Sequence, residues 1–493
     1  MGKKASIWNR LRGLFKTDEL PLDETPPPPS TTDAKDSEPE FFPKPPVSQL
    51  SVPLQEIKPE PETKPRRPEP ERPRVSKAQV VDLVMGIDLG TSCSKVVIGD
   101  PGWKDVSFAA SFGDGLPDDI ATWLYPTRFG DEANLKLRLM NDPESLDKRN
   151  LMACYLADLI GRSRTWFEKR GPAGYARREI EWSLSLGFPD KSVGDSSLYR
   201  AYRDVADLAV KLASQSQELS PGLAAQCRQN ELDVIPFIDA KRVHIYPEIA
   251  AQLAGYVNSP YRKQGSLLLV DVGAGTIDVS TIILHNDQEQ EIVSFHVCEV
   301  EQLGALKLYE ARRDAIEEVT PGCVRHSLEH FQDGTRPIPA DLEAMALDSS
   351  YDVRTRYDEA TEQFAQKVVA LGIRCLTRFR ACQREAHFNP NFDPWGDNLR
   401  FFLTGGGSRF QFFREILTEG RLEDRLVQNH TRWHQDPARR RAARQGFKLE
   451  TMPTPANLKE FPDSLRADFD RLSVAYGLAY GRENLMKITT AAQ

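Results

Sequence analysis

The sequence predicts an α/β fold built from two similar halves that follow a proline-rich segment, and three observations carry this prediction. Sixteen of the 35 prolines lie before residue 79. Two apolar strands, around Val84 and Leu268, each lead through a turn with an aspartate and a glycine into a β-branched strand. The chain has 493 residues. The part after the proline-rich segment, about 415 residues, is long enough to bury a large core.

Composition excludes several classes of protein. The 64 basic and 72 acidic residues give a net charge of −8, which argues against a nucleic-acid-binding surface along the whole chain. The seven cysteines form no CxxC pair and no secretory signal is visible, so we expect a reducing, cytoplasmic location. Since no run of about 18 apolar residues occurs, we expect no membrane-spanning helix.

The first 78 residues are expected to act as a tether. In residues 1–17, apolar side chains recur at helical spacing from Ile7 to Phe15, and only basic charges precede Asp18. This pattern predicts a basic amphipathic helix for a membrane interface or a groove on a partner. Docking on the chain's own body and lipidation at Gly2 are the alternatives. Residues 18–78 mix proline with both signs of charge, which predicts a disordered linker.

The first glycine turn lies between the strands near Val84 and Val97 and spans residues 88–92. Glycine lets the backbone approach a phosphate group, and hydroxyl and N–H groups can cradle that group. An aspartate at the end of a strand, here Asp88, can hold Mg²⁺ through water. A second turn, at 271–276, repeats this plan after Asp271. The repetition predicts a duplicated fold that clamps one polyphosphate between its halves.

A third glycine turn, at 405–409, follows the apolar strand that ends at Leu403. Its glycines would let a flat base lie against the backbone, and the guanidinium of Arg409 could stack on that base. The chain lacks the pattern GxxxxGK[ST], so we do not expect a P-loop nucleotide site.

These segments resemble the motifs of the actin / heat-shock protein 70 / sugar-kinase superfamily of ATPases, and within it most closely those of the DnaK-type chaperones. Residues 88–95, 270–280 and 403–410 resemble the two phosphate motifs and the adenosine motif. Residues 244–256 resemble the connecting helix, and 300–310 have a faint likeness to a glycine turn of the family. Residues 471–481 resemble the closing helix, in which Gly477 is the crossing glycine.

The resemblance implies a duplicated actin-like (ribonuclease H-like) ATPase fold with ATP and Mg²⁺ in a cleft between two lobes. Lobe I is expected at 79–262 and lobe II, with the closing helix, at 263–493. Since only twelve residues follow Gly481, we expect the ATPase half without a substrate-binding domain.

The resemblance also assigns roles to residues. Asp88 and Asp271 would hold the hydrated Mg²⁺, and together with Glu248, which would position the attacking water, they form the expected catalytic set. The residues expected to bind the nucleotide are Gly90, Thr91, Ser92, Lys95, Gly273, Ala274, Gly275, Thr276, Gly405, Gly406, Gly407 and Arg409. The phosphate-binding lysine of the first chaperone lobe has no match by motif.

The expected function is a DnaK-like, Mg²⁺-dependent ATPase whose opening and closing drives interaction with protein partners. Three alternatives stay open. One is an actin-like filament-forming ATPase, and another is a small-molecule kinase of the same superfamily. The third is a scaffold that binds nucleotide without hydrolysing it. This last alternative rests on the order Pro247-Glu248, because the family has the glutamate first and one residue turns a helical side chain by about 100°.

Two further patterns have alternative functional interpretations. His326, Glu329 and His330 match the HxxEH pattern of inverted zinc peptidases, although a third ligand is not identifiable. The arginines between Arg439 and Arg444 form a basic patch that could meet an anionic partner. A chance match and a solvated loop are the simpler interpretations of these two patterns.

Overall fold

The computed structural model separates into two units, Met1–Arg74 and Val75–Gln493. It describes residues 80–102, 106–112, 123–176, 178–189, 196–232, 234–257, 259–287, 290–322, 351–385, 400–418, 448–460, 463–480 and 488–490. The predicted amphipathic helix, the predicted linker, the HxxEH pattern and the arginine patch lie outside the described residues. None of the helices in the described part is long and apolar enough to cross a membrane.

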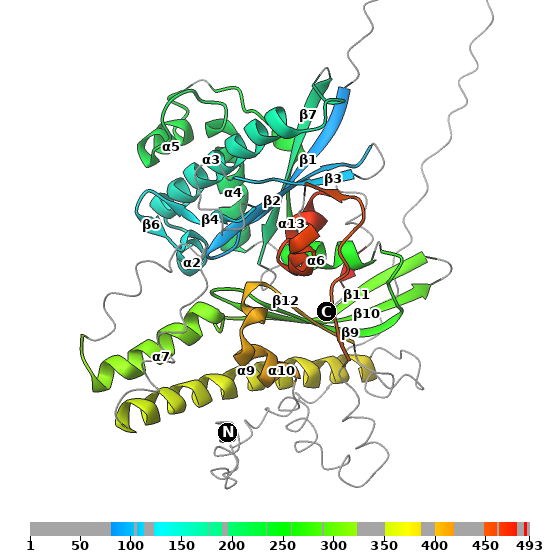
Figure 1. Ribbon diagram of the computed structural model, residues 1–493. Helices are drawn as coiled ribbons and strands as arrows, with labels where there is room; N and C mark the ends of the chain where they lie inside the picture. Colours follow the sequence, from blue (N-terminus) through cyan, green and yellow to red (C-terminus); the bar gives the residue numbers. More distant parts are fainter. Residues whose placement is uncertain are drawn as a thin grey trace, which may run out of the picture. The chain divides into compact units, whose positions relative to one another are not determined.

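The first sheet has the strand order β14-β3-β2-β1-β7-β8, with β4 paired to β2 (Figure 1). The strands β3, β2 and β1 are antiparallel to one another, whereas β7 and β8 continue the sheet in parallel with β1. The strands are β1 (Val80–Asp88), β2 (Cys93–Asp100), β3 (Val106–Ala109), β4 (Tyr125–Pro126), β7 (Glu179–Phe188), β8 (Val243–Pro247) and β14 (Leu458–Lys459). A separate two-stranded sheet pairs β5 (Arg128–Phe129) with β6 (Glu132–Ala133).

The second sheet has the order β13-β12-β9-β10-β11-β15. Here β11, β10 and β9 are antiparallel, and β12 and β13 continue in parallel with β9. The strands are β9 (Gly265–Val272), β10 (Ile277–Asp287), β11 (Gln290–Glu301), β12 (Arg400–Thr404), β13 (Lys448–Glu450) and β15 (Ile488–Thr490). Each sheet therefore contains a three-stranded antiparallel meander followed by two parallel strands, and each carries one further parallel strand on its meander edge.

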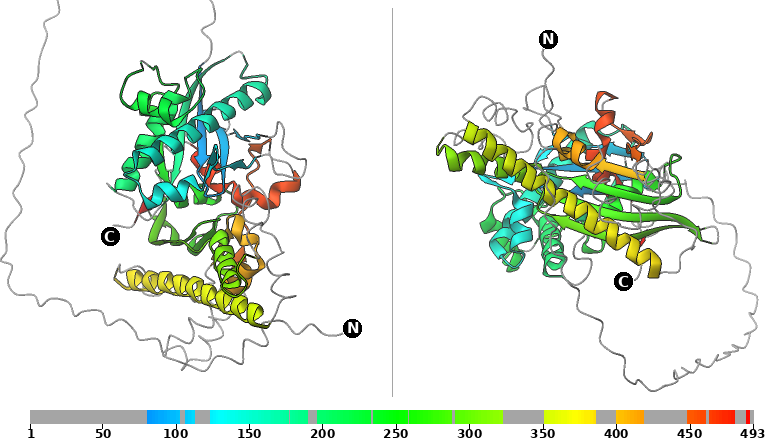
Figure 2. Two further views of the ribbon diagram at one scale, coloured as in Figure 1. Left: turned by 90° about the vertical axis from the view of Figure 1, so that its left-hand side faces the viewer. Right: turned by 90° about the horizontal axis from the view of Figure 1, so that it is seen from below.

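Helices cover both sheets (Figures 1 and 2). In the first half they are α2 (Leu135–Asn141), α3 (Leu146–Arg170), α4 (Ser197–Leu212) and α5 (Pro221–Arg228), with the short 3₁₀ helix η2 (Ala240–Arg242). The others are α6 (Glu248–Val257), α7 (Ala305–Val319), α9 (Tyr351–Glu385), η3 (Gly406–Arg409), α10 (Gln411–Thr418), η4 (Asp463–Arg471) and α13 (Ser473–Leu478). The side chains of Ser145 and Ser196 cap the N-termini of α3 and α4, as serine does at many helix starts.

Successive side chains of the central strands point to opposite faces of each sheet, and the core is therefore divided into layers. Leu83 and Met85 of β1 pack with α3 and α4, whereas Leu268 and Val270 of β9 pack with α9 and α10. Leu267 of β9 faces the other way and packs in a third cluster with residues of α6 and α13. The two helices therefore form a layer that contacts both sheets, because α13 also contacts β1 and β2 (Figure 1). Although β14 and α13 fall within 263–493, the range predicted for the second lobe, both contact the first sheet.

Candidate functional site

The first and second glycine turns face each other. The first joins β1 to β2, and the second joins β9 to β10. An ideal Cβ atom on Gly275 would lie 2.9 Å from Thr91 Oγ1 and 3.0 Å from a methyl group of Leu137. The backbone of the second turn therefore lies against the hydroxyl group of the first. Thr91 and Thr276 are each 7% exposed, so both hydroxyl groups lie at the edge of a largely buried space.

The first turn is held from behind by Thr127, which follows β4. Its hydroxyl donates to the carbonyl oxygen of Gly90 at 2.8 Å, and its backbone N–H donates to the carbonyl oxygen of Ser92 at 2.8 Å. Thr127 is itself buried and lies 3.1 Å from Ser94 Oγ. Since two carbonyl groups of the turn accept bonds from the protein, the turn has a fixed backbone conformation before any ligand binds.

The second turn is held by the start of α7. The backbone N–H groups of Gly304, Ala305 and Leu306 donate to carbonyl oxygens of the turn at 3.2, 3.0 and 2.8 Å. These N–H groups belong to the first turn of a helix, which has no intrahelical acceptors for them. The faint family likeness at residues 300–310 thus corresponds to a backbone clamp on the turn.

Asp88 and Lys95 form an ion pair below the first turn. Lys95 Nζ lies 2.8 Å from Asp88 Oδ2, and the side chains are 15% and 9% exposed. An ideal Cβ on Gly90 would lie 3.2 Å from the same Nζ. The ammonium group of Lys95 is therefore within reach of both the carboxylate and the glycine turn.

Glu248 forms a second ion pair, with Lys136 of α2. Lys136 Nζ lies 2.7 and 2.8 Å from the two carboxylate oxygens of Glu248. Burial lowers the pKa of Lys136, but Glu248, Tyr202 and Asp88 together outweigh burial, so the net pKa is raised and the lysine is charged. Burial acts on Glu248 as well and raises its pKa, whereas Lys136 opposes that shift. Lys136 occupies the first half of the fold, where the sequence offered no match for the expected phosphate-binding lysine.

The reversed order Pro247-Glu248 does not remove the carboxylate from the site. Pro247 ends β8, and Glu248 is the first residue of α6. The proline therefore stands in the strand rather than in the helix, and no helical rotation separates Glu248 from the site. An ideal Cβ on Gly187 would lie 3.0 Å from Glu248 Cγ, which places the side chain against the end of β7.

Two aspartates of the second sheet lie opposite each other in the β9–β10 register, Asp271 and Asp278. Burial and the carboxylate of Asp88 raise the pKa of Asp271 to about 7. Burial and the carboxylate of Asp271 raise the pKa of Asp278 to about 8. These effects show that Asp88, Glu248, Asp271 and Asp278 share one electrostatic environment. The site therefore holds four carboxyl groups against the ammonium groups of Lys95 and Lys136.

This excess of carboxyl groups fits a hydrated Mg²⁺ ion that accompanies a polyphosphate. Hard oxygen ligands suit Mg²⁺, which usually keeps several waters and few protein ligands. Among the residues that the structure describes, no three acidic, histidine or cysteine side chains gather closely enough to hold a metal ion directly. Asp88 and Asp271 are the residues that would hold the ion through its waters, and Lys95 and Lys136 would meet the phosphate charge.

The third glycine turn lies beside Asp271 rather than apart from it. Gly405 has a φ of 81°, and an ideal Cβ on it would lie 2.1 Å from Asp271 Oδ1. Arg409, expected to stack on a base, is bonded through its Nη2 atom to carboxylate oxygens of Asp468 and Asp470 at 2.5 and 2.8 Å. An ideal Cβ on Gly406 would lie 3.6 Å from Arg471 Nε. Hence both arginines flank this turn, and Arg471 was not among the predicted residues.

Besides Arg471, four contributors to the site were not predicted: Thr127, Lys136, Asp278 and Gln252, whose side-chain amide donates to Asp271 Oδ2. Asp278 lies within the second phosphate motif. It is a second aspartate that follows the turn as Asp271 precedes it, and this repetition could have indicated Asp278 from the sequence. Lys136 and Thr127 carry no local signal, because their partners are far away in the sequence. Gln252 stands one helical turn after Glu248, so helix periodicity alone places it on the same face.

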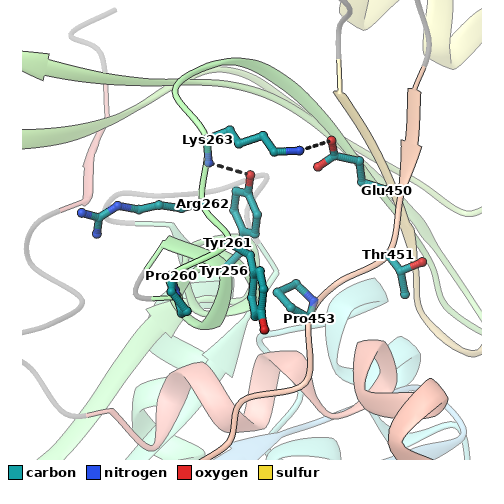
Figure 3. Close-up of a pocket in the computed structure, with 8 residues that line it drawn as sticks. All are labelled: Tyr256, Pro260, Tyr261, Arg262, Lys263, Glu450, Thr451 and Pro453. Atoms are coloured by element: carbon teal, nitrogen blue, oxygen red, sulfur yellow. Dashed lines mark hydrogen bonds and ion pairs between the residues drawn. The ribbon is translucent and has the colours of Figure 1, made fainter.

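One pocket lies outside this site (Figure 3). It has a volume of about 640 Å³ and is formed by the segment after α6 and the segment after β13. Lys263 and Glu450 face each other across it, 3.4 Å apart, beside the aromatic rings of Tyr256 and Tyr261. None of the residues predicted to bind nucleotide lines this pocket.

The chain was compared with known proteins. No family model and no curated protein matches it. Among solved structures it is similar to a 15-stranded ParM filament from Clostridium botulinum, over 80% of this chain and 99% of that chain. The identity is 12% and the TM-score is 0.37.

Gly275 provides a direct test of the facing turns. In Gly275→Ala the new methyl group meets Thr91 Oγ1 at 2.9 Å, so we expect the turns to separate and the affinity for Mg²⁺·ATP to fall about tenfold or more, because small misplacements of binding groups are costly. Gly102→Ala is the matched control, since its Cβ meets nothing closer than 3.6 Å. Equilibrium binding of both variants measures the difference. Equal affinities would show that the turns do not share a ligand.

Proposed function

We propose that the chain binds ATP with Mg²⁺ between its two sheets and hydrolyses it, with the duplicated two-lobed fold of actin-like ATPases. The observation that carries this proposal is the approach of Gly275 to Thr91, which brings two strand–turn–strand units face to face. The repeated strand order of the two sheets supports the duplication. Asp88 and Asp271 would hold the hydrated Mg²⁺, and Lys95 and Lys136 would meet the negative charge of the phosphates.

Each group has a defined task in this proposal. The hydroxyl groups of Thr91 and Thr276 and the backbone of both turns bind the phosphates. Lys95 and Lys136 supply positive charge, which stabilises negative charge that moves onto the leaving phosphate oxygens. When bound, Mg²⁺ would neutralise phosphate charge.

In this proposal Glu248 orients the attacking water. Burial raises the pKa of Glu248, and the charged Lys136 beside it opposes that shift and favours the ionised carboxylate. An ionised carboxylate accepts a hydrogen bond from a water molecule and directs it. Catalysis of this kind depends on positioning and charge rather than on a covalent intermediate.

Phosphate release by the full chain tests hydrolysis. We expect Mg²⁺-dependent release that falls about 100-fold or more in Glu248→Gln, with ATP binding retained, because the amide cannot orient water in the same way. Asp271→Asn should weaken Mg²⁺-dependent binding itself. Binding without release by the parent protein would instead identify a scaffold that does not hydrolyse its nucleotide.

A filament-forming ATPase is the second candidate, since the same site serves actin-like proteins that assemble. The described fold fits a filament-forming ATPase and a DnaK-like ATPase equally. Right-angle light scattering after addition of ATP separates them: a rise that reverses on hydrolysis supports assembly. Phosphate release without any rise supports a monomeric clamp whose opening and closing acts on a protein partner.

We propose further that residues 1–17 bring the protein to a membrane surface or partner. Five basic charges and one apolar face support the proposal. Deletion of residues 2–17 should abolish co-sedimentation of the chain with vesicles of phosphatidylcholine and phosphatidylserine. Trp8→Ser should weaken it, and vesicles without the anionic lipid should bind less. Equal sedimentation of the deleted and full chains would exclude a membrane anchor.

A further inference from the structure

Gln252 links the candidate magnesium aspartate to the third glycine turn. It lies on α6, is 1% exposed, and its side-chain nitrogen donates to Asp271 Oδ2 at 2.5 Å and to Thr404 Oγ1 at 3.0 Å. An amide nitrogen has two N–H groups, so these two bonds use both. Thr404 in turn lies 3.3 Å from the carbonyl oxygen of Val270, to which its hydroxyl donates.

The orientation of this amide follows from its partners. The nitrogen of Gln252, and not its oxygen, lies toward both Asp271 and Thr404. The Thr404 hydroxyl uses its hydrogen on Val270 and therefore meets the amide as an acceptor. Each bond thus fixes the direction of the next one.

Asp271 is confined on its other side as well. Its second carboxylate oxygen, Oδ1, faces Gly405, where a side chain would clash at 2.1 Å. The carboxylate is therefore held between the amide of Gln252 and the backbone of the third turn. This arrangement gives Gly405 a role in packing against Asp271, in addition to any contact with a base.

The helix that carries Gln252 also carries Glu248, one turn earlier. Residues at i and i+4 lie on the same helical face. Glu248 contacts Lys136 in the first half of the fold, whereas Gln252 contacts Asp271 and Thr404 in the second sheet. One face of α6 therefore connects functional side chains of both halves.

We propose that Gln252 is a positioning residue that aims the Asp271 carboxylate at the site and so sets the affinity for Mg²⁺ in the nucleotide complex. This inference rests on the proposed nucleotide function. Without the amide, Asp271 Oδ2 loses its donor and the side chain can rotate. The phosphate contacts of the first turn and of Lys95 do not involve Gln252 and stay in place.

The test is the binding of ATP to the full chain, measured with Mg²⁺ and with EDTA. For the parent protein we expect Mg²⁺ to strengthen binding. In Gln252→Ala and in the isosteric Gln252→Glu that gain should fall about tenfold or more, the scale of one hydrogen bond to a charged group. Binding in EDTA should stay within about twofold of the parent in Gln252→Ala, which also shows that this variant is folded.

Two further variants define the mechanism. Thr404→Val keeps the bond to Asp271 but removes the second acceptor of the amide, so its loss should be smaller than that of Gln252→Ala. Gln302→Ala is the matched control, because its amide also joins distant segments, donating to Asn141 Oδ1 at 3.2 Å, but lies at the surface. If Mg²⁺ strengthens ATP binding by Gln252→Ala as much as it does by the parent protein, the inference about Gln252 is wrong. That result would leave the proposed nucleotide function unaffected. No ATP binding by the parent would overturn the proposed function.

Discussion

Gly477→Ala is expected to destabilise the protein by about 3 kcal/mol or more, the upper range for forcing extra atoms into a packed core. An ideal Cβ on Gly477 of α13 would lie 1.7 Å from the carbonyl oxygen of Ala251 on α6. The clashing atoms all belong to the backbone of Ala251, so no side-chain rotation relieves the contact, and the two helices must separate. Chemical denaturation monitored by circular dichroism measures the loss.

The matched control is Gly161→Ala in the middle of α3. An ideal Cβ there meets nothing within 4 Å. The substitution should be neutral or stabilising by about 0.5–1 kcal/mol, because alanine restricts the unfolded chain and favours helix. If Gly477→Ala unfolds at the same denaturant concentration as the parent, then α6 and α13 do not cross at this residue, and the layer between the sheets is described wrongly.

Lys136→Met is expected to cost about 3–5 kcal/mol of stability and to abolish ATP turnover. The substitution leaves the Glu248 carboxylate buried without its cation, and a buried charge that loses its partner is strongly destabilising. Lys148→Met is the control, because the Lys148–Asp142 pair is 35% and 50% exposed and such pairs contribute about 0–1 kcal/mol. Thermal and denaturant unfolding of both variants give the comparison.

The same variant should show a characteristic pH dependence. Burial already raises the pKa of Glu248 above the unfolded value, and removal of Lys136, which opposes that shift, raises the pKa further, so folding favours the protonated carboxyl more strongly. Between the unfolded and the folded pKa of Glu248, the folded state binds more protons than the unfolded state. The free energy of unfolding therefore falls as the pH rises through this window. Lys136→Met should therefore lose more stability at pH 8 than at pH 5.

A double substitution separates the two effects of Lys136. Adding Glu248→Gln to Lys136→Met removes the unpaired charge and should recover much of the lost stability. Turnover should stay lost, because both the lysine charge and the water-orienting carboxylate are gone. Recovery of turnover together with stability would show that neither side chain acts in the reaction.

The sequence was sufficient to predict the parts of the fold that depend on local patterns. Both strand–turn–strand units were predicted: Asp88 ends β1, and Asp271 is the last residue but one of β9. The crossing at Gly477 was predicted from the motif, and the short approach to Ala251 agrees with it. These features could be read from the sequence because alternation and glycine turns leave a signal within a few residues.

The remaining features of the site depend on contacts between distant residues. In the sequence, Lys136 is an ordinary basic residue of a short helix. Only its contact with Glu248, 112 positions later, indicates that it belongs to the site. Arg409 was assigned to a base from its place in the third glycine turn and from the resemblance, yet its partners Asp468 and Asp470 lie about 60 positions away and cannot be paired by pattern. The order Pro247-Glu248, reversed relative to the family, suggested a rotated carboxylate, whereas in the structure Pro247 ends β8 and Glu248 begins α6.

The central claim is that the facing glycine turns clamp one nucleoside triphosphate with Mg²⁺. Isothermal titration of the full chain with ATP, with and without Mg²⁺, tests it most directly. The account predicts one ATP per chain, tighter binding with Mg²⁺ than without it, and a loss of that binding in Gly275→Ala but not in Gly102→Ala. No heat of binding with Mg²⁺·ATP, or equal binding by Gly275→Ala and the parent, would contradict it.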